Sequence, residues 1–230
     1  MTDLTCLYYT ANRLPPAFAE AVRAELVRAV DGRYPILTVS QGPLAFGDHQ
    51  IDIGPVGPSI LTLYRQVLLG AEAATTPYVA LCEDDTLYSR SHFDCHRPAL
   101  DTFAYDHHKW ALYTWGPAIF SAKTNRSVLN QCIAPREQLI AALTERFRKT
   151  YPPDRVEKHF AEPGRYEKWL QVTEQKLETF WAPDPSIVIS HEYALGFRHL
   201  GTRKALGETQ CTELPGWGHA ADLRARVCGA

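Results

Sequence analysis

Three adjacent carboxylates, Glu83, Asp84 and Asp85, form an acidic triplet directly after the apolar run YVALC at residues 78–82. Carboxylates this close repel one another, so a positively charged partner is expected beside them. Their oxygen atoms are the ligands that Mg²⁺ and Mn²⁺ prefer, and such ions are often shared with substrate phosphates. A helix N-terminus, where the helix dipole favours acidic residues, is the alternative interpretation of the triplet.

A histidine and a basic segment later in the chain extend this set of candidates. His191 follows the β-branched run SIVIS at residues 186–190, and a neutral imidazole is a good Mn²⁺ ligand. Arg203 and Lys204 lie in the segment GTRK, and such side chains bind diphosphates near a metal site. An ordinary hydrogen-bonded histidine and a solvated basic loop are the respective alternatives. The sequence lacks the glycine-rich motifs of dinucleotide-binding and P-loop proteins.

The elements that would position these residues alternate between strand and helix. Apolar patterns predict strands and helices in chain order at 5–11 (strand), 15–30 (helix), 34–41 (strand), 59–74 (helix) and 78–83 (strand). Ser59 is the expected N-cap of the second helix. This order predicts an α/β fold with a parallel sheet. Ligands bind beyond the carboxyl ends of the strands in such sheets, and the acidic triplet follows one of those ends.

The rest of the chain gives a less regular pattern. We expect helices at 90–100, 135–149 and 166–180, and strands at 110–116, 118–122, 127–134 and 186–190. Glycine, proline or polar residues predict irregular segments at 44–58, 151–165 and 205–230, and the last of these is expected to wrap the site.

Composition bounds the class of protein. The 230 residues are 45% hydrophobic and 22% charged, which suits a single globular domain. The six cysteines show no CxxC spacing, which argues against a zinc ribbon. Neither a signal segment nor an apolar stretch of ~18 residues is present, so we expect a soluble protein of the cytoplasm, the host cytoplasm if it is viral, without membrane association.

Charge is distributed unevenly along the chain. Residues 1–122 carry 8 Lys and Arg against 13 Asp and Glu, whereas residues 123–204 carry 14 against 10. The first part therefore suits a cation and the second an anion.

This constellation resembles the GT-A glycosyltransferases, which use nucleotide sugars with Mn²⁺ or Mg²⁺. The similarity covers most of the chain in element order, and the acidic triplet is its one recognised motif. It implies a Rossmann-like α/β/α sandwich with a central, mostly parallel sheet in a single catalytic domain. Residues 1–122 would form the nucleotide- and metal-binding half, 123–204 the acceptor half and 205–230 a tail.

The resemblance also implies roles for individual residues. Asp85 and His191 would be metal ligands, and the donor would be a nucleotide sugar, a UDP-sugar first of all. Its binding residues would be Thr10, Asn12, Arg13, Arg65, Glu83, Asp84, Arg203 and Lys204. An inverting enzyme needs a carboxylate base, for which Glu167 is the first candidate and Glu162 the second. Solvated helix charges are the alternative for both and for Arg65, and without a base here the enzyme would be retaining.

The acceptor is constrained least. Trp217, between two glycines, and Trp169 could each stack on a sugar or base, although Trp217 could equally close the core. Basic and aromatic residues interleave over 146–169, which suits DNA. The stretch is similar in style to compact viral enzymes that glycosylate 5-hydroxymethylpyrimidines such as hydroxymethylcytosine in DNA, which must extrude the base. Balancing acids in the same stretch favour ordinary solvated helices instead.

Other classes of function stay open on the sequence alone. A nucleotidyltransferase of similar topology would need a glycine-rich loop after the first strand, and TANRLPP at 10–16 does not supply one. A non-catalytic nucleotide- or nucleic-acid-binding module predicts binding without turnover. A metal phosphoesterase would require more histidine and aspartate ligands at several strand ends.

Overall fold

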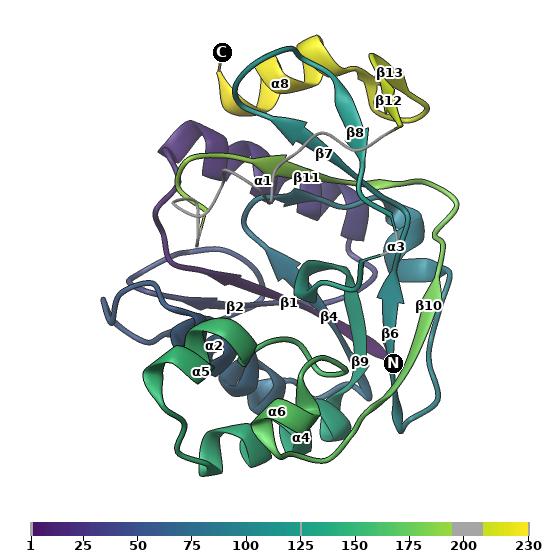
Figure 1. Cartoon of the computed structure of the whole chain (residues 1–230). Coiled ribbons are helices and arrows are strands. Elements are labelled where there is room, and N and C mark those ends of the chain that lie inside the picture. The colour runs from purple at the N-terminus through teal and green to yellow at the C-terminus, as the bar shows by residue number, and fades with distance from the viewer. Residues whose placement is uncertain (1, 125, 195–208, 230) are drawn as a thin grey trace.

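The computed structural model describes residues 2–124, 126–194 and 209–229 (Figure 1). Within these ranges, one group of strands comprises β1 (Leu4–Thr10), β2 (Ile36–Ser40), β3 (His49–Asp52), β4 (Tyr78–Glu83), β6 (Thr102–Asp106), β9 (Cys132–Pro135) and β10 (Lys176–Phe180). A second group comprises β5 (Thr86–Leu87), β7 (Lys109–Tyr113), β8 (Phe120–Ala122), β11 (Ser186–Ser190) and β12 (Gln210–Cys211), and β13 (Glu213–Leu214) pairs with β14 (Gly218–His219). The helices are α1 (Pro16–Val30), α2 (Ile60–Ala73), α3 (Arg90–Asp94), α4 (Arg136–Arg148), α5 (Pro153–His159), α6 (Glu167–Leu170) and α8 (Ala220–Cys228), with a 3₁₀ turn η1 (Leu129–Gln131).

The first group of strands forms one sheet of mostly parallel strands. Its order is β10-β6-β9-β4-β1-β2-β3. β1 pairs in parallel with β4 and β2, and β10 pairs in parallel with β6, whereas β9 is antiparallel to both of its neighbours. Every residue of β1 and β2 is buried, as expected for parallel strands covered on both faces. The predicted α/β class with a central, mostly parallel sheet is confirmed.

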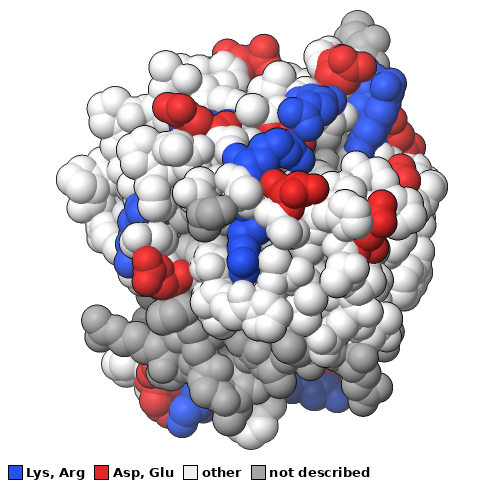
Figure 2. Space-filling view, turned by 90° about the horizontal axis from the view of Figure 1, so that it is seen from above, with Lys and Arg blue, Asp and Glu red and all other residues white. Residues whose placement is uncertain are grey.

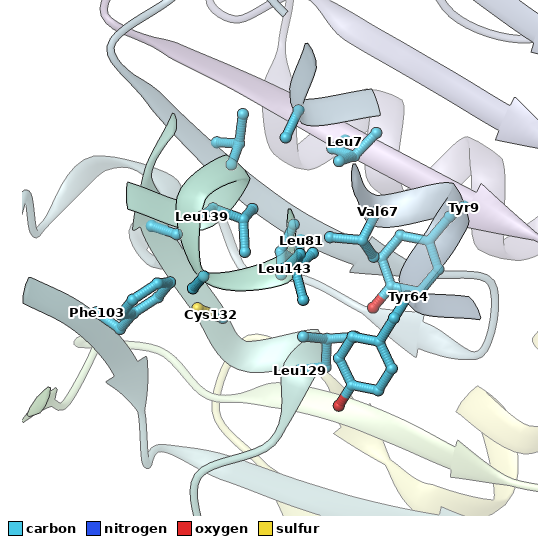
Figure 3. Packing of buried hydrophobic residues seen from close by; sticks show 14 of the residues in the cluster. Leu7, Tyr9, Tyr64, Val67, Leu81, Phe103, Leu129, Cys132, Leu139 and Leu143 are labelled. Atoms are coloured by element: carbon cyan, nitrogen blue, oxygen red, sulfur yellow. The ribbon is translucent and has the colours of Figure 1, made fainter. Parts of the chain in front are cut away.

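Helices cover both faces of this sheet. α2 and α4 pack on one face, where Figure 3 shows Val67 of α2 and Leu139 and Leu143 of α4 against Leu7 and Leu81 of the strands. α1 and α3 pack on the other face, and a second core lies there. The smaller sheet, of order β12-β8-β7-β11-β5, packs with α1 and α8 around a core of its own. The sequence therefore builds three apolar layers around the strands that carry the acidic triplet.

The predicted helix at 166–180 is wrong. α6 ends after Leu170, and residues Lys176–Phe180 form the edge strand β10 beside β6. Tyr166 and Gln171 have positive φ angles of 62° and 55°, which end a right-handed helix on both sides of this single turn. Pairing with β6, which lies far away in the chain, outweighs the local helical pattern.

Smaller corrections concern the segments expected to be irregular. Residues 44–58 contain the exposed strand β3, and 151–165 contain helix α5, where Pro153 occupies the first turn rather than interrupting it. Only the second half of 127–134 is a strand, because η1 precedes β9. The helix at 90–100 is limited to α3.

The tail differs from expectation as well. Residues Ala220–Cys228 form helix α8, which packs on α1 and does not line the cavity described below. Arg226 of α8 pairs with buried Glu25 of α1. Figure 2 shows the face seen from above, on which Lys and Arg lie among Asp and Glu instead of forming one field of a single sign. None of the helices in the described ranges has the length and apolar character needed to cross a membrane.

Candidate functional site

A cavity of about 480 Å³ opens at the carboxyl ends of β1 and β4. Ligands bind at this edge in open α/β sheets. Its lining includes the ends of β1 and β4 with helix α2, strands β7 and β11, described residues between β8 and β9, and the segment between α5 and α6. The acidic triplet and His191 are both in the lining, so the structure brings together the two candidates that the sequence analysis ranked as a metal pair.

The first side of the site is held by the pairing of β1 with β4. Tyr9 lies opposite Glu83 in the sheet register, and its hydroxyl donates to Glu83 Oε1 at 3.1 Å. The next residue, Thr10, donates its hydroxyl hydrogen to Asp84 Oδ2. Thr10 Oγ1 also accepts from the backbone N–H of Asn12 at 2.9 Å. The first strand thus fixes two of the three carboxylates directly.

Burial and mutual repulsion disfavour the charged forms of Glu83 and Asp84 in the triplet. Burial, followed by repulsion from Asp85, raises the pKa of Asp84 to about 6. The same two causes hold the pKa of Glu83 well above its usual range. A cation in the cavity would relieve this repulsion by favouring the charged forms.

Asp85 and His191 face each other across the strands β5 and β11. His191 Nε2 lies 3.4 Å from Asp85 Oδ2, and the N–H of Ile189 donates to the backbone carbonyl of Asp85 at 2.7 Å. Phe18 of α1 contacts the imidazole edge-on, with ring centroids 5.5 Å apart. Helix α1 and strand β11 therefore hold a nearly fully buried histidine against the last acid of the triplet.

These side chains fit a hard divalent cation only in part. Carboxylate oxygens suit Mg²⁺ or Mn²⁺, and the Nε2 atom of His191 is buried without a hydrogen-bond partner. However, Nδ1 of His191 accepts from the N–H of Tyr193 at 3.1 Å, so a neutral ring carries its hydrogen on Nε2. Among the described residues, no three His, Cys, Asp or Glu side chains converge closely enough to hold a metal alone. Asp85 and Asp84 would hold the ion, and substrate oxygens would have to complete its coordination.

Helix α2 presents a residue that the sequence analysis missed. Gln66 lines the cavity, and its Nε2 donates to the carbonyls of Thr10 and Val39, at 2.9 Å in each case. It therefore ties α2 to the carboxyl ends of β1 and β2. The predicted contact, Arg65, is its neighbour on the helix but is exposed and lies outside the lining. The available signal for Gln66 was its place directly before Val67, on a helix that is otherwise largely apolar around it.

The two candidate bases lie in different surroundings. Glu162 lines the cavity, accepts from the Tyr64 hydroxyl at 3.3 Å and pairs with Arg165 Nη1 at 2.6 Å. Glu167 lies outside the lining, where it pairs with the buried Arg146 at 2.9 Å. Glu167 also accepts from the N–H of Gly164. Glu167 thus shapes the turn before α6, and Glu162 alone of the two faces the cavity.

Basic and amide side chains from β7 and from the segments that follow it also line the cavity. These residues, none of them a candidate from sequence, are Lys109, Lys123, Arg126 and Asn130. Asn130 Nδ2 donates to Thr86 Oγ1 at 2.9 Å, while its buried Oδ1 has no hydrogen-bond partner.

Of the remaining site residues predicted from the sequence, only some lie at the cavity. Arg13 is in the lining, whereas Asn12 is exposed and donates from Nδ2 to Gly42 O at 3.4 Å. Trp169 is 60% exposed and stacks on His159 outside the cavity, with ring centroids 4.9 Å apart. Trp217 donates from Nε1 to Pro185 O at 2.8 Å and is also outside the lining. Arg203 and Lys204 lie outside the described residues.

No family model matches the sequence, and neither does any curated protein. Solved structures that the chain resembles include a nucleotidyl transferase from Methanothermobacter thermautotroptrophicus, with 13% identity, a TM-score of 0.40, and 63% of this chain and 76% of that one covered. Another is a glycosyltransferase involved in the glycosylation of the major capsid of PBCV-1, with 10% identity, a TM-score of 0.43, and 77% and 81% covered. A third is the catalytic domain of Drosophila beta1,4galactosyltransferase 7 in complex with xylobiose, with 9% identity, a TM-score of 0.43, and 87% and 79% covered.

Glycosyltransferases are thus among the structures that this chain resembles, as the sequence predicted, and so is a nucleotidyl transferase, the class of the runner-up. Similarity at this level carries no argument about activity, so the residues of the cavity have to support the functional proposal.

Proposed function

We propose that this chain is a glycosyltransferase that moves a sugar from a nucleoside diphosphate to an acceptor hydroxyl with the help of Mn²⁺ or Mg²⁺. The observation that carries the proposal is the cavity itself. At the carboxyl ends of β1 and β4 its lining combines the acidic triplet with the basic residues Lys109, Arg126 and Arg165. A metal ion that carries a diphosphate needs carboxylates such as those of the triplet. The acceptor needs a carboxylate that activates its hydroxyl, and Glu162 is in the same lining.

The donor half of the proposal rests on the carboxylates and on α2. Asp85, next to Asp84, is the proposed metal ligand, and His191 is the weaker one because its Nδ1 already accepts a hydrogen bond. A bound divalent cation would neutralise the charge that develops on the departing diphosphate. Tyr9, Arg13 and Gln66 line the same end of the cavity and would hold the nucleoside, with UDP as the first candidate.

Glu162 is the proposed base of an inverting reaction. It would accept the proton of the acceptor hydroxyl as that oxygen attacks the sugar. Its place in the cavity lining favours it over Glu167, which is paired with Arg146 elsewhere. Arg165 and Tyr64 would keep its carboxylate pointed at the acceptor. A retaining reaction would make Glu162 dispensable for the proton transfer.

DNA as acceptor stays a prediction. Two of the basic residues that suggested it, Arg146 and Arg165, are engaged in ion pairs with Glu167 and Glu162. Trp169 keeps an exposed indole face, which suits a base or a sugar ring equally well. An oligonucleotide with 5-hydroxymethylcytosine is therefore one acceptor to test beside small sugars and phosphorylated metabolites.

The test is to follow the phosphorus products by ³¹P NMR. The protein is incubated with UDP-sugars and Mn²⁺, with and without acceptors, and separately with UTP and sugar 1-phosphates. We expect UDP to be released from the UDP-sugar, and Glu162→Gln to slow transfer without weakening UDP binding. Pyrophosphate release from UTP and sugar 1-phosphate, with no UDP from any UDP-sugar, would contradict the proposal and favour a nucleotidyltransferase.

A further inference from the structure

Lys109 is a buried cation at the start of β7. It is 3% exposed, it lines the cavity, and its ammonium donates to the backbone carbonyl of Arg126. No ion pair joins Lys109 to an Asp or Glu anywhere in the described ranges. An ammonium has three N–H donors, so hydrogen-bonding capacity remains beside the cavity. Buried charges without a counter-ion are costly, so one that lines a cavity is a candidate for binding a ligand of opposite charge.

The position of Lys109 separates it from the proposed metal site. Strand β7 runs parallel to β11, with Tyr113 opposite Ser190, the residue before His191, and Lys109 opposite Ser186 (Figure 1). The two ends of β7 are about 13 Å apart at the rise of an extended strand. The charge of Glu162 acts on both Glu83 and Lys109, so the candidate base is near enough to influence both groups. Lys109 is thus at the opposite end of β7 from the end that lies beside Ser190 and His191.

Two arginines line the same cavity as Lys109. Arg126 and Arg165 both line the cavity, and Arg165 also pairs with Glu162. The groups that act on the lysine are Arg126, His107, Asp106 and Glu162. Burial is the main cause that lowers the pKa of Lys109 to about 8, and an anion at its ammonium would oppose that decrease.

We propose that Lys109, together with Arg126 and Arg165, binds an anionic group, a phosphate or a carboxylate, carried by the acceptor. The inference rests on the proposed function, because it assigns the acceptor to the end of β7 that lies away from His191. It identifies the acceptor by chemistry: a hydroxyl compound with a negative charge a few bonds from the reacting oxygen. A neutral acceptor would leave the lysine without a counter-ion in the complex.

The test measures binding, so that it does not depend on turnover. Methyl phosphate, and acetate in parallel, are titrated by calorimetry into the protein with UDP and Mg²⁺ already bound. The variants are Lys109→Met, Asp85→Asn and the control Lys158→Met, which removes an exposed lysine of α5. We expect methyl phosphate or acetate to bind beside UDP, and Lys109→Met to weaken that binding about tenfold or more, since a charge-assisted hydrogen bond is lost. The control should bind as the wild type does.

Asp85→Asn separates this inference from the proposed function, because it should weaken the binding of UDP and leave the binding of methyl phosphate or acetate unchanged. If UDP fails to bind to the wild type while methyl phosphate binds through Lys109, the proposed function is wrong and the anion site stands. Displacement of UDP by methyl phosphate, or equal binding of both anions to wild type and Lys109→Met, overturns the inference. So does tighter binding of UDP-glucuronate than UDP-glucose that depends on Lys109, because the anion would then belong to the donor sugar.

Discussion

Replacing Lys109 by methionine should stabilise the protein at neutral pH. Burial lowers the pKa of Lys109 from 10.5 to about 8, and one pKa unit corresponds to about 1.36 kcal/mol. The charged lysine therefore costs the folded state about 3 kcal/mol below pH 8. Methionine keeps the apolar stem and removes the charge, but loses the hydrogen bond to the Arg126 carbonyl, worth about 1 kcal/mol. We expect a net gain of about 2 kcal/mol, or about 4–8 °C in melting temperature.

The pH dependence identifies the cause. Because the folded-state pKa lies below the unfolded value, the unfolded chain binds more protons between pH 8 and 10.5, and wild-type stability gains from rising pH in that window. Urea unfolding of wild type and Lys109→Met, followed from pH 7 to 10.5, should show the gap between them closing above pH 8. Lys158→Met should show no gap of this kind. A Lys109→Met protein less stable than wild type at pH 7, or a gap that is constant with pH, would refute the reasoning.

Three further substitutions test the packing around the site. Thr10→Val removes the hydroxyl that donates to the acidic triplet, and calorimetry should show UDP–Mn²⁺ affinity reduced about tenfold with the fold intact; unchanged affinity would remove Thr10 from the site. Glu167→Ala leaves Arg146 buried and unpaired, so urea unfolding should show a loss of about 3 kcal/mol; a loss of activity at wild-type stability would instead make Glu167 the base. Gly70→Ala puts a Cβ 2.1 Å from Leu7 Cδ1 and should destabilise by about 1–3 kcal/mol; the gain of about 1 kcal/mol expected from helix propensity alone would contradict this packing.

The sequence predicted the part of the fold that local patterns determine. β1 and β4 are apolar runs bounded by polar turns, and Ser59 accepts from the N–H of Thr62 at 3.0 Å as the N-cap of α2. The failure at 166–180 has a different origin, because β10 exists through its pairing with β6, which lies far away in the chain. Pro153, read as an interruption, is compatible with a first helical turn because its missing N–H would have no partner there.

The residues of the site likewise divide into those that local sequence patterns predict and those that depend on distant contacts. The triplet and Thr10 were predictable because parallel neighbouring strands bring their carboxyl ends together. Gln66 and Lys109 were not, since each owes its position to backbone carbonyls of other segments: Thr10 and Val39 for Gln66, and Arg126 for Lys109. The choice between Glu162 and Glu167 likewise depends on which of them Arg146 engages, a contact that no local pattern reveals.

The most direct measurement is the melting temperature of the wild type and of Asp85→Asn against nucleoside diphosphates, with and without Mn²⁺. A ligand that binds only the folded state raises the melting temperature by mass action, by the equivalent of about 2.7 kcal/mol at a hundred times its dissociation constant. A shift with UDP that requires Mn²⁺ and is lost in Asp85→Asn is the predicted result. No shift of the wild type with any nucleoside diphosphate, or an equal shift in Asp85→Asn, would contradict a metal–diphosphate site at the acidic triplet.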